Sequence, residues 1–215
     1  MSWLFSFIWS SLGRKLLMAL TGFCFCMFLV MHLFGNLMLY GGRDAFNGYA
    51  EKLHQLGVLV TVFELGLLTF GIIHVLTGSI LFYQNFAARP VRYAVRASGG
   101  GQTLGSATMP YTGFLVLVFV VFHLIDFHFA DRTNATIYDI VSTAFHDPFH
   151  LATYIFVMIV VAVHVSHGFW SAFQTFGLNH VKYMPLIKGL SLAFAFVVGL
   201  GFGFIPIYIA LFRGQ

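Results

Sequence analysis

The 215-residue sequence contains very little charge, since 11 lysines and arginines and 7 acidic residues make up only 8% of the chain. Hydrophobic residues account for 59% and aromatic residues for 18%, and the mean hydropathy is +0.88. So few polar residues could not cover such an apolar surface in water, which excludes soluble, disordered and collagen-like chains. The net charge of +4 does not indicate nucleic-acid binding. We predict an integral membrane protein.

Cysteine is also scarce. Cys24 and Cys26 lie two residues apart in an apolar run, too few for a disulfide framework or a four-thiolate metal site. The sequence has no C-x-x-C-H motif, which excludes covalent haem attachment of that kind. We expect both cysteines to be buried without a chemical role.

Long apolar runs are abundant instead. Five runs of 24 to 36 residues contain no Asp, Glu, Lys or Arg apart from Glu64. Because a spanning helix needs about 20 apolar residues, the sequence predicts one all-α membrane domain over 1–215. Its five transmembrane helices are expected near 16–40, 57–84, 110–130, 149–176 and 189–211, with the first four forming a four-helix bundle.

The charges between these helices predict the orientation. Six of the seven acids fall on one side of the membrane. The other side receives seven cations and no acid, namely Arg14, Lys15, Arg89, Arg92, Arg96, Lys182 and Lys188. The positive-inside rule then places the N-terminus in the cytoplasm and the C-terminus outside.

Histidines are the most informative polar residues of the sequence. Ten are present, and four of them lie one on each of the first four predicted helices: His32, His74, His123 and His164. A single histidine in a helix is often only a hydrogen-bonded interior residue. The set is more telling, because 42 residues separate the first two and 41 the last two, as if the first helix pair were repeated by the second.

Chain direction predicts the depth of each histidine. His32 and His123 come late in helices that run outward, whereas His74 and His164 lie past the middle of helices that run inward. We therefore pair His32 with His123 near the outer side, and His74 with His164 nearer the cytoplasm. Two imidazoles at each of two levels of a four-helix bundle favour axial ligation of two haems. A zinc or di-metal site would need histidines and carboxylates at one level.

Small residues near three of these histidines predict room for a flat cofactor. Gly35, Gly78 and Gly168 follow their histidines by three or four residues, which places them on or near the same helix face. His123 has no such glycine. His167 lies three residues after His164 and is an alternative ligand, while we expect most of the remaining histidines at the membrane interfaces.

Three segments carry a family resemblance: H-L-F-G-N from His32, A-F-N ending at Asn47, and H-V-S-H-G-F-W-S from His164. With the histidine spacing, they resemble the single-subunit, di-haem cytochrome b of bacterial succinate:quinone oxidoreductases, the succinate dehydrogenase and fumarate reductase family. The likeness covers nearly the whole chain and implies five helices, with His32, His74, His123 and His164 as the haem iron ligands. In that family the first histidine of the last segment is the ligand, which selects His164 over His167.

The resemblance implies a subunit of a multi-pass enzyme complex in the bacterial inner membrane. Its partners would be a flavoprotein with FAD and an iron-sulfur subunit, both on the cytoplasmic side, with dicarboxylate chemistry confined to them. Electrons would pass between the iron-sulfur subunit and a membrane quinone, expected to be menaquinone, through two b haems. Some family members carry a proton-conducting glutamate two residues before the fourth ligand, but this sequence has Ala162 there.

Two carboxylates are candidates for quinone and proton chemistry, which needs hydrogen-bonding groups close to a haem edge. Glu64 is the only acid well inside a predicted helix, at about the level of His32. Glu51 lies at the outer entry of the second helix and resembles in placement the family's acidic residue near the outer haem.

Two other functions fit the same residues. The chain could be the cytochrome b anchor of a hydrogenase or formate dehydrogenase, which also holds haem between a few helices. A function of another class is a transporter or proton channel with a histidine relay.

Overall fold

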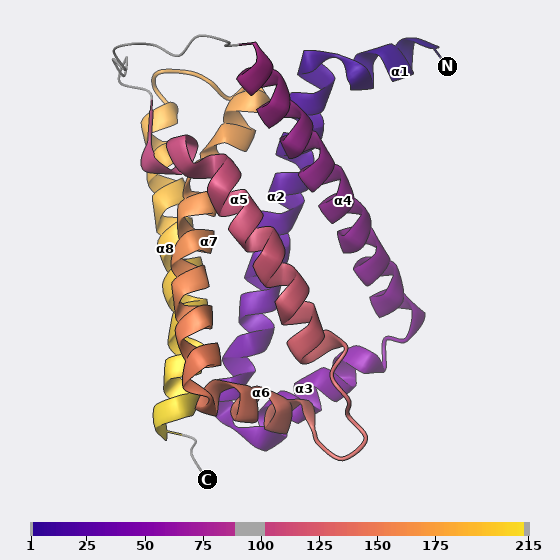
Figure 1. The fold of residues 1–215 in the computed structure, drawn as a ribbon, viewed down its shortest axis with the longest axis vertical. Helices are drawn as coiled ribbons and strands as arrows, with labels where there is room; N and C mark the ends of the chain where they lie inside the picture. The colour runs from indigo at the N-terminus through magenta and orange to yellow at the C-terminus, as the bar shows by residue number, and fades with distance from the viewer. Residues whose placement is uncertain (1, 89–101, 213–215) are drawn as a thin grey trace.

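The computed structural model describes residues 2–88 and 102–212, all of whose regular structure is helical. Five long helices form the molecule (Figure 1), and each apolar span is long enough to cross a membrane. A 3-10 turn, η1 (Leu37–Gly41), extends the first, and a π-helical turn, η2 (Leu124–His128), extends the third. The predicted all-α fold with five spans is confirmed. The helices are α2 (Ser11–Asn36), α4 (Val58–Ala87), α5 (Leu104–His123), α7 (Pro148–Thr175) and α8 (Met184–Phe212).

The predicted start of the third span was wrong. We expected a helix from residue 110, but α5 begins at Leu104, and Pro110 lies inside it. Thr103 and Ser106 form a capping box that starts the helix. The Thr108 hydroxyl donates to the Leu104 carbonyl at 2.8 Å, so this polar first turn satisfies its own side chains.

Three short helices complete the fold at the two ends. α1 (Ser2–Trp9) runs nearly across the direction of α2, with Trp3 and Trp9 exposed (Figure 1). We call its side of the molecule the α1 end, predicted to be cytoplasmic. α3 (Arg43–His54) and α6 (Ile137–His146), which the sequence analysis did not predict, lie at the opposite end, the α6 end. Three of the cations behind the predicted orientation, Arg89, Arg92 and Arg96, lie outside the described residues.

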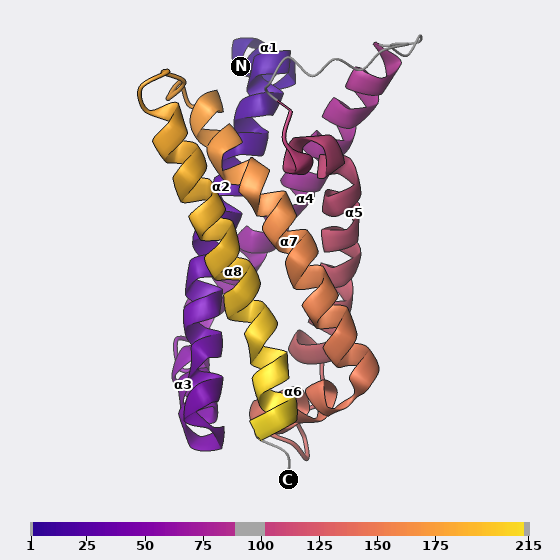
Figure 2. The ribbon, with the colours of Figure 1, turned by 90° about the vertical axis from the view of Figure 1, so that its left-hand side faces the viewer.

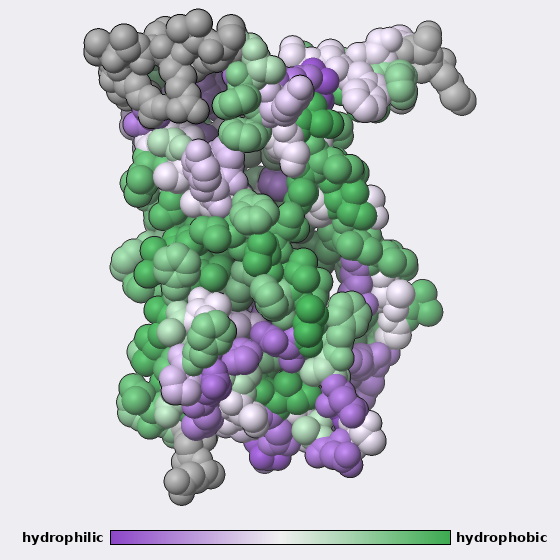
Figure 3. Space-filling model, in the orientation of Figure 1, coloured by the Kyte–Doolittle hydropathy of each residue, from purple (hydrophilic) through white to green (hydrophobic). Residues whose placement is uncertain are grey.

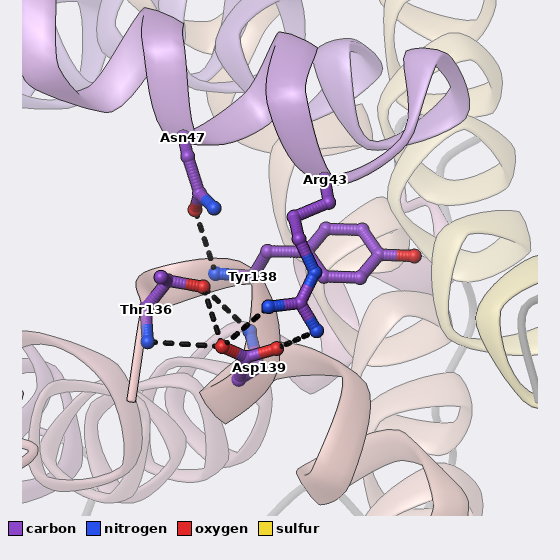
Figure 4. A network of polar contacts seen from close by, with 5 residues as sticks. All are labelled: Arg43, Asn47, Thr136, Tyr138 and Asp139. Carbon is purple, nitrogen blue, oxygen red and sulfur yellow. Dashed lines mark hydrogen bonds and ion pairs between the residues drawn. The ribbon is translucent and has the colours of Figure 1, made fainter. Parts of the chain in front are cut away.

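α3 and α6 are joined by the polar network of Figure 4. Arg43 forms an ion pair with Asp139, and the Asn47 side chain accepts the Tyr138 backbone N–H at 3.2 Å. The pKa of Asp139 lies below its ordinary value, mainly because the Thr136 hydroxyl donates to its carboxylate and also because the positive charge of Arg43 is close. These contacts hold α3 against α6. The α2–α4 connection, which contains α3, and the α5–α7 connection, which contains α6, therefore close the same end of the bundle.

α7 is the central helix of the packing. It lies against α8 along most of its length and also contacts α5 and α2 (Figures 1 and 2). Gly199 brings α8 close, since a side chain there would meet the Ala162 methyl at 2.9 Å. α4 packs mainly on α2, and its most apolar 18-residue window contains no buried residue.

The outer surface of the bundle suits a lipid environment. Apolar side chains cover most of the middle of the face in Figure 3, whereas polar residues gather toward its two ends. Large side chains such as Phe63 and Phe196 are about two-thirds exposed. In water such an apolar surface would be unfavourable, so its natural solvent is the membrane interior.

Candidate cofactor site

The structure brings His32 and His123 together, and we call them the outer pair. His32 on α2 and His123 on α5 have ring centroids 5.8 Å apart, with their planes nearly perpendicular at 88°. Each imidazole stacks on a phenylalanine one turn earlier in its own helix, Phe28 at 5.1 Å and Phe119 at 5.6 Å. The rings are therefore held in place by aromatic packing from both helices.

The spacing of the outer pair is compatible both with two ligands of one metal ion and with an edge-to-face contact of the two rings. Metal–imidazole bonds are about 2 Å long and a ring centroid lies about 1 Å beyond its nitrogen, so opposite ligands have centroids about 6 Å apart. The Tyr154 hydroxyl lies 3.4 Å from His123 Nδ1. This contact occupies Nδ1 and leaves Nε2 of His123 for a ligand.

His74 on α4 and His164 on α7 are the second predicted pair, which we call the inner pair. His164 lies within electrostatic reach of both His74 and His167. Each member of the inner pair has a threonine partner on the preceding long helix. Thr21 Oγ1 lies 3.0 Å from His74 Nδ1, and Thr112 Oγ1 lies 3.1 Å from His164 Nδ1.

The threonines fix which ring nitrogen carries the proton. Thr21 donates its hydroxyl to the Leu17 carbonyl at 2.7 Å, and Thr112 donates to the Thr108 carbonyl at 3.1 Å. Because each hydroxyl has one proton, it must accept from the histidine, whose Nδ1 is then protonated. The Nε2 lone pair remains free, which is the state a metal-binding imidazole needs.

Glycines next to these threonines allow the imidazoles to approach. A Cβ atom at Gly22 would lie 3.2 Å from His74 Cε1, and one at Gly113 would lie 3.2 Å from His164 Cε1. The two sites have the same separations, so the same local structure is built twice. Gly22 and Gly113 are site residues that the sequence analysis missed.

A repeated sequence motif underlies this duplication. Residues 18–32 and 109–123 are identical at seven of fifteen positions, in the pattern M-x-x-T-G-F-x-x-x-x-F-x-V-x-H. The motif supplies the threonine, the glycine, the stacking phenylalanine and the outer-pair histidine of each half. Aligning the two helices, rather than comparing histidine spacings alone, would have revealed these residues.

The motif also sets the distance between the two pairs. On each helix, the threonine that contacts an inner histidine comes 11 residues before the outer histidine: Thr21 before His32, and Thr112 before His123. At about 1.5 Å per residue, the two levels lie about 16 Å apart along the helices. Two separate groups could therefore be held one above the other between the same four helices.

His167 differs from His164 in its surroundings. Its Nδ1 atom is buried without a hydrogen-bond partner among the described residues, and its ring contacts Trp170 edge-on at 4.9 Å. With no threonine to set its protonation, His167 is the weaker ligand candidate of the two.

The three predicted glycines have different neighbours. A Cβ atom at Gly35 would lie 2.8 Å from the Tyr49 ring, so Gly35 allows α3 to approach α2, and its place beside a cofactor stays a prediction. Gly78 faces the terminal methyl group of Met18 at 2.9 Å, and Gly168 faces that of Met109 at 3.6 Å. Methionine ends are flexible, so both glycines still border adaptable space beside the inner pair.

The two candidate acids lie in different places. Glu51 on α3 lines an open cavity of about 680 Å³ at the α6 end, together with His54 and Arg132. Glu64 lies on the exposed side of α4, where its carboxylate is 3.8 Å from the imidazole of His128 on η2. The structure therefore offers two separate polar sites rather than one shared acid cluster.

Comparisons with family models, curated proteins and solved structures found no match. Within residues 2–88 and 102–212 no three His, Cys, Asp or Glu side chains gather as a metal site. The iron of a porphyrin needs only two axial imidazoles from the protein.

Proposed function

We propose that this chain is the di-haem cytochrome b anchor of a succinate:quinone oxidoreductase, which passes electrons between a membrane quinone and an iron-sulfur subunit. The observation that carries the proposal is the pair of imidazole sites built by one repeated motif. In the inner pair, both threonines leave Nε2 free to bind iron, and the outer pair has the spacing of two axial ligands.

The residues divide into ligands and groups that orient them. His32 and His123 would hold the outer haem, and His74 and His164 the inner haem. When bound, haem accepts and gives up single electrons. Thr21 keeps the His74 ring in one protonation state and orientation, which preserves the Nε2 lone pair and makes the ligand more basic.

Side chains of the bundle also favour an electron carrier. Phe28 and Phe119 cover the outer imidazoles, and Phe25 packs edge-on against His74 at 5.7 Å. Such apolar walls exclude water and limit the rearrangement that accompanies a change of charge. Toward the α1 end, the buried Arg14 Nε has no hydrogen-bond partner among the described residues, and this guanidinium would be available to a haem propionate.

The proposed partners are a flavoprotein with FAD and an iron-sulfur subunit at the α1 end, in the bacterial inner membrane. The cations predicted at this end support their docking. Lys188, for example, lies over the Trp170 ring at 4.9 Å, near the last turns of α7. A hydrogenase or formate dehydrogenase anchor would hold haem in the same way, and the proteins that co-purify in mild detergent distinguish these complexes.

Quinone reactivity is expected to depend on one of the two acids. The test is to replace each acid in turn, as Glu51→Gln and Glu64→Gln, in the purified complex. The variant that removes the proton-exchanging acid should lower quinone-linked turnover about a hundredfold. Dye-linked succinate oxidation or fumarate reduction should stay unchanged in both variants, because it bypasses the membrane site.

Asp44→Asn is the matched control, since Asp44 is an exposed acid on the same helix as Glu51. It should retain wild-type turnover with both acceptors. Full quinone activity in both glutamate variants would show that neither acid takes part.

A further inference from the structure

The outer pair differs from the inner pair in the partner of its histidine Nδ1 atoms. Both inner histidines contact threonine hydroxyls that donate onward to backbone carbonyls. His123 of the outer pair instead contacts the Tyr154 hydroxyl at 3.4 Å, and Tyr154 donates to the Asp126 carboxylate at 3.0 Å. Among the described residues, only the outer pair is thus linked through successive hydrogen bonds to an ionisable acid.

This chain of contacts continues to the surface of the α6 end. His150 Nε2 lies 3.8 Å from Asp126, and His150 Nδ1 lies 3.1 Å from Asp147. Tyr154 is 7% exposed, while the side chains of Asp126, His150 and Asp147 are 22%, 40% and 51% exposed. Exposure rises at every step, so protons can move between Asp126 and outside water over short distances.

The π-helical turn explains the position of Asp126. In η2 the Phe129 N–H bonds to the Leu124 carbonyl, five residues back, at 2.9 Å. Asp126 thereby faces α7, while His128 faces Glu64 on α4. Single π turns inside helices are frequent at functional sites.

Other ionisable groups on the neighbouring elements have contacts of their own. Among the described residues, the ionisable side chains in contact with Asp126 are Tyr154 and His150. His128 lies near Glu64, and His146 contacts the Ser142 carbonyl. Asp139 forms an ion pair with Arg43. Arg132 donates to the Phe127 carbonyl and lies 3.3 Å from His54.

We propose that Asp126 is a redox-linked proton acceptor for the outer pair. The inference rests on the proposed haem-binding function. Asp126 takes up one proton from outside water through His150 when the group held by His32 and His123 gains one electron, and it releases the proton when that electron leaves. The electron comes from the quinone or the iron-sulfur subunit, so charge and atoms balance.

The physical cause is electrostatic. A negative charge added between His32 and His123 disfavours the ionised form of Asp126, which lies two hydrogen bonds from His123, and so favours its protonation. Conversely, ionised Asp126 stabilises the oxidised form and lowers the midpoint potential. The potential of the outer component should therefore fall as pH rises. The inner component has uncharged threonine partners and should vary less with pH.

Redox titration of the purified chain at several pH values tests this inference. We expect the wild-type outer component, the one lost in His32→Ala, to show a potential that falls with pH. Asp126→Asn should hold it near its acid-limit value at every pH. Tyr154→Phe should weaken the pH dependence while keeping the ring packing, and Asp131→Asn, a nearby exposed acid, should behave as wild type.

Two results would overturn the inference, and they have different meanings. A chain that binds two haems but whose outer potential is independent of pH, or keeps its pH dependence in Asp126→Asn, contradicts the role of Asp126 alone. A chain that binds no haem contradicts the proposed function and this inference together.

Discussion

Replacing either His32 or His123 with alanine is expected to remove the same haem and to lower the haem content from two to one per chain. Loss of one imidazole leaves a single axial ligand, and the remaining site cannot hold the group in its original state. His74→Ala and His164→Ala should remove the other haem. Optical spectra and redox titration of the four variants would show whether they fall into these two groups.

His167→Ala serves as the control for this series. His167 lies three residues from His164 but has no hydroxyl partner for its Nδ1 among the described residues, so both haems should remain. Grouping of His32 with His74, or loss of a haem in His167→Ala with retention in His164→Ala, would contradict the pairing.

Adding a side chain at Gly22 or Gly113 should remove the inner haem and leave the outer one. A Cβ atom at either position would lie 3.2 Å from the facing imidazole, already a tight contact. The two γ-methyl groups of valine would reach further and push His74 or His164 out of its position, since closely packed interiors yield little. Gly22→Val and Gly113→Val should therefore show the spectrum of His74→Ala, with one haem per chain.

Gly66→Val is the matched control because a Cβ at Gly66, also within a long helix, would meet no atom within 4 Å. It introduces the same β-branched residue and should retain both haems. Two full haems in Gly22→Val and Gly113→Val would show that the inner imidazoles do not depend on this close approach.

The spanning helices could be predicted because the bilayer imposes a length on apolar runs. The charge-free runs gave all five spans, with errors mainly at the ends. The apolar run predicts a third span from about residue 110, where Pro110 stands. The structure begins α5 earlier, at a capping box whose polar side chains satisfy one another.

The histidine positions were accessible from chain direction alone. Helices that alternate in direction place His32 near His123, as the 5.8 Å centroid distance shows. Gly35 could not be judged in this way, because its neighbour Tyr49 belongs to α3, a helix that the hydropathy pattern does not reveal. Short polar helices depend on capping and on contacts such as Arg43 with Asp139, which are distant in the sequence.

The hydroxyl groups that contact the histidine Nδ1 atoms were the least predictable residues of the site. Thr21 and His74 are 53 residues apart, and Tyr154 and His123 are 31 apart. No periodicity links such residues, and only the repeated motif of α2 and α5 hints at two of them. Glu51 and Glu64 were chosen for their charge, and their separation into two sites follows from the course of α3 and α4.

The most direct test of the account is the haem content of the purified chain. A pyridine haemochrome assay, combined with amino-acid analysis for the protein concentration, measures non-covalent b haem per polypeptide. Two haems per chain are expected, one for each histidine pair. A value of one would leave one pair without its ligand, and a value of zero would contradict the proposal that this chain carries electrons through the membrane.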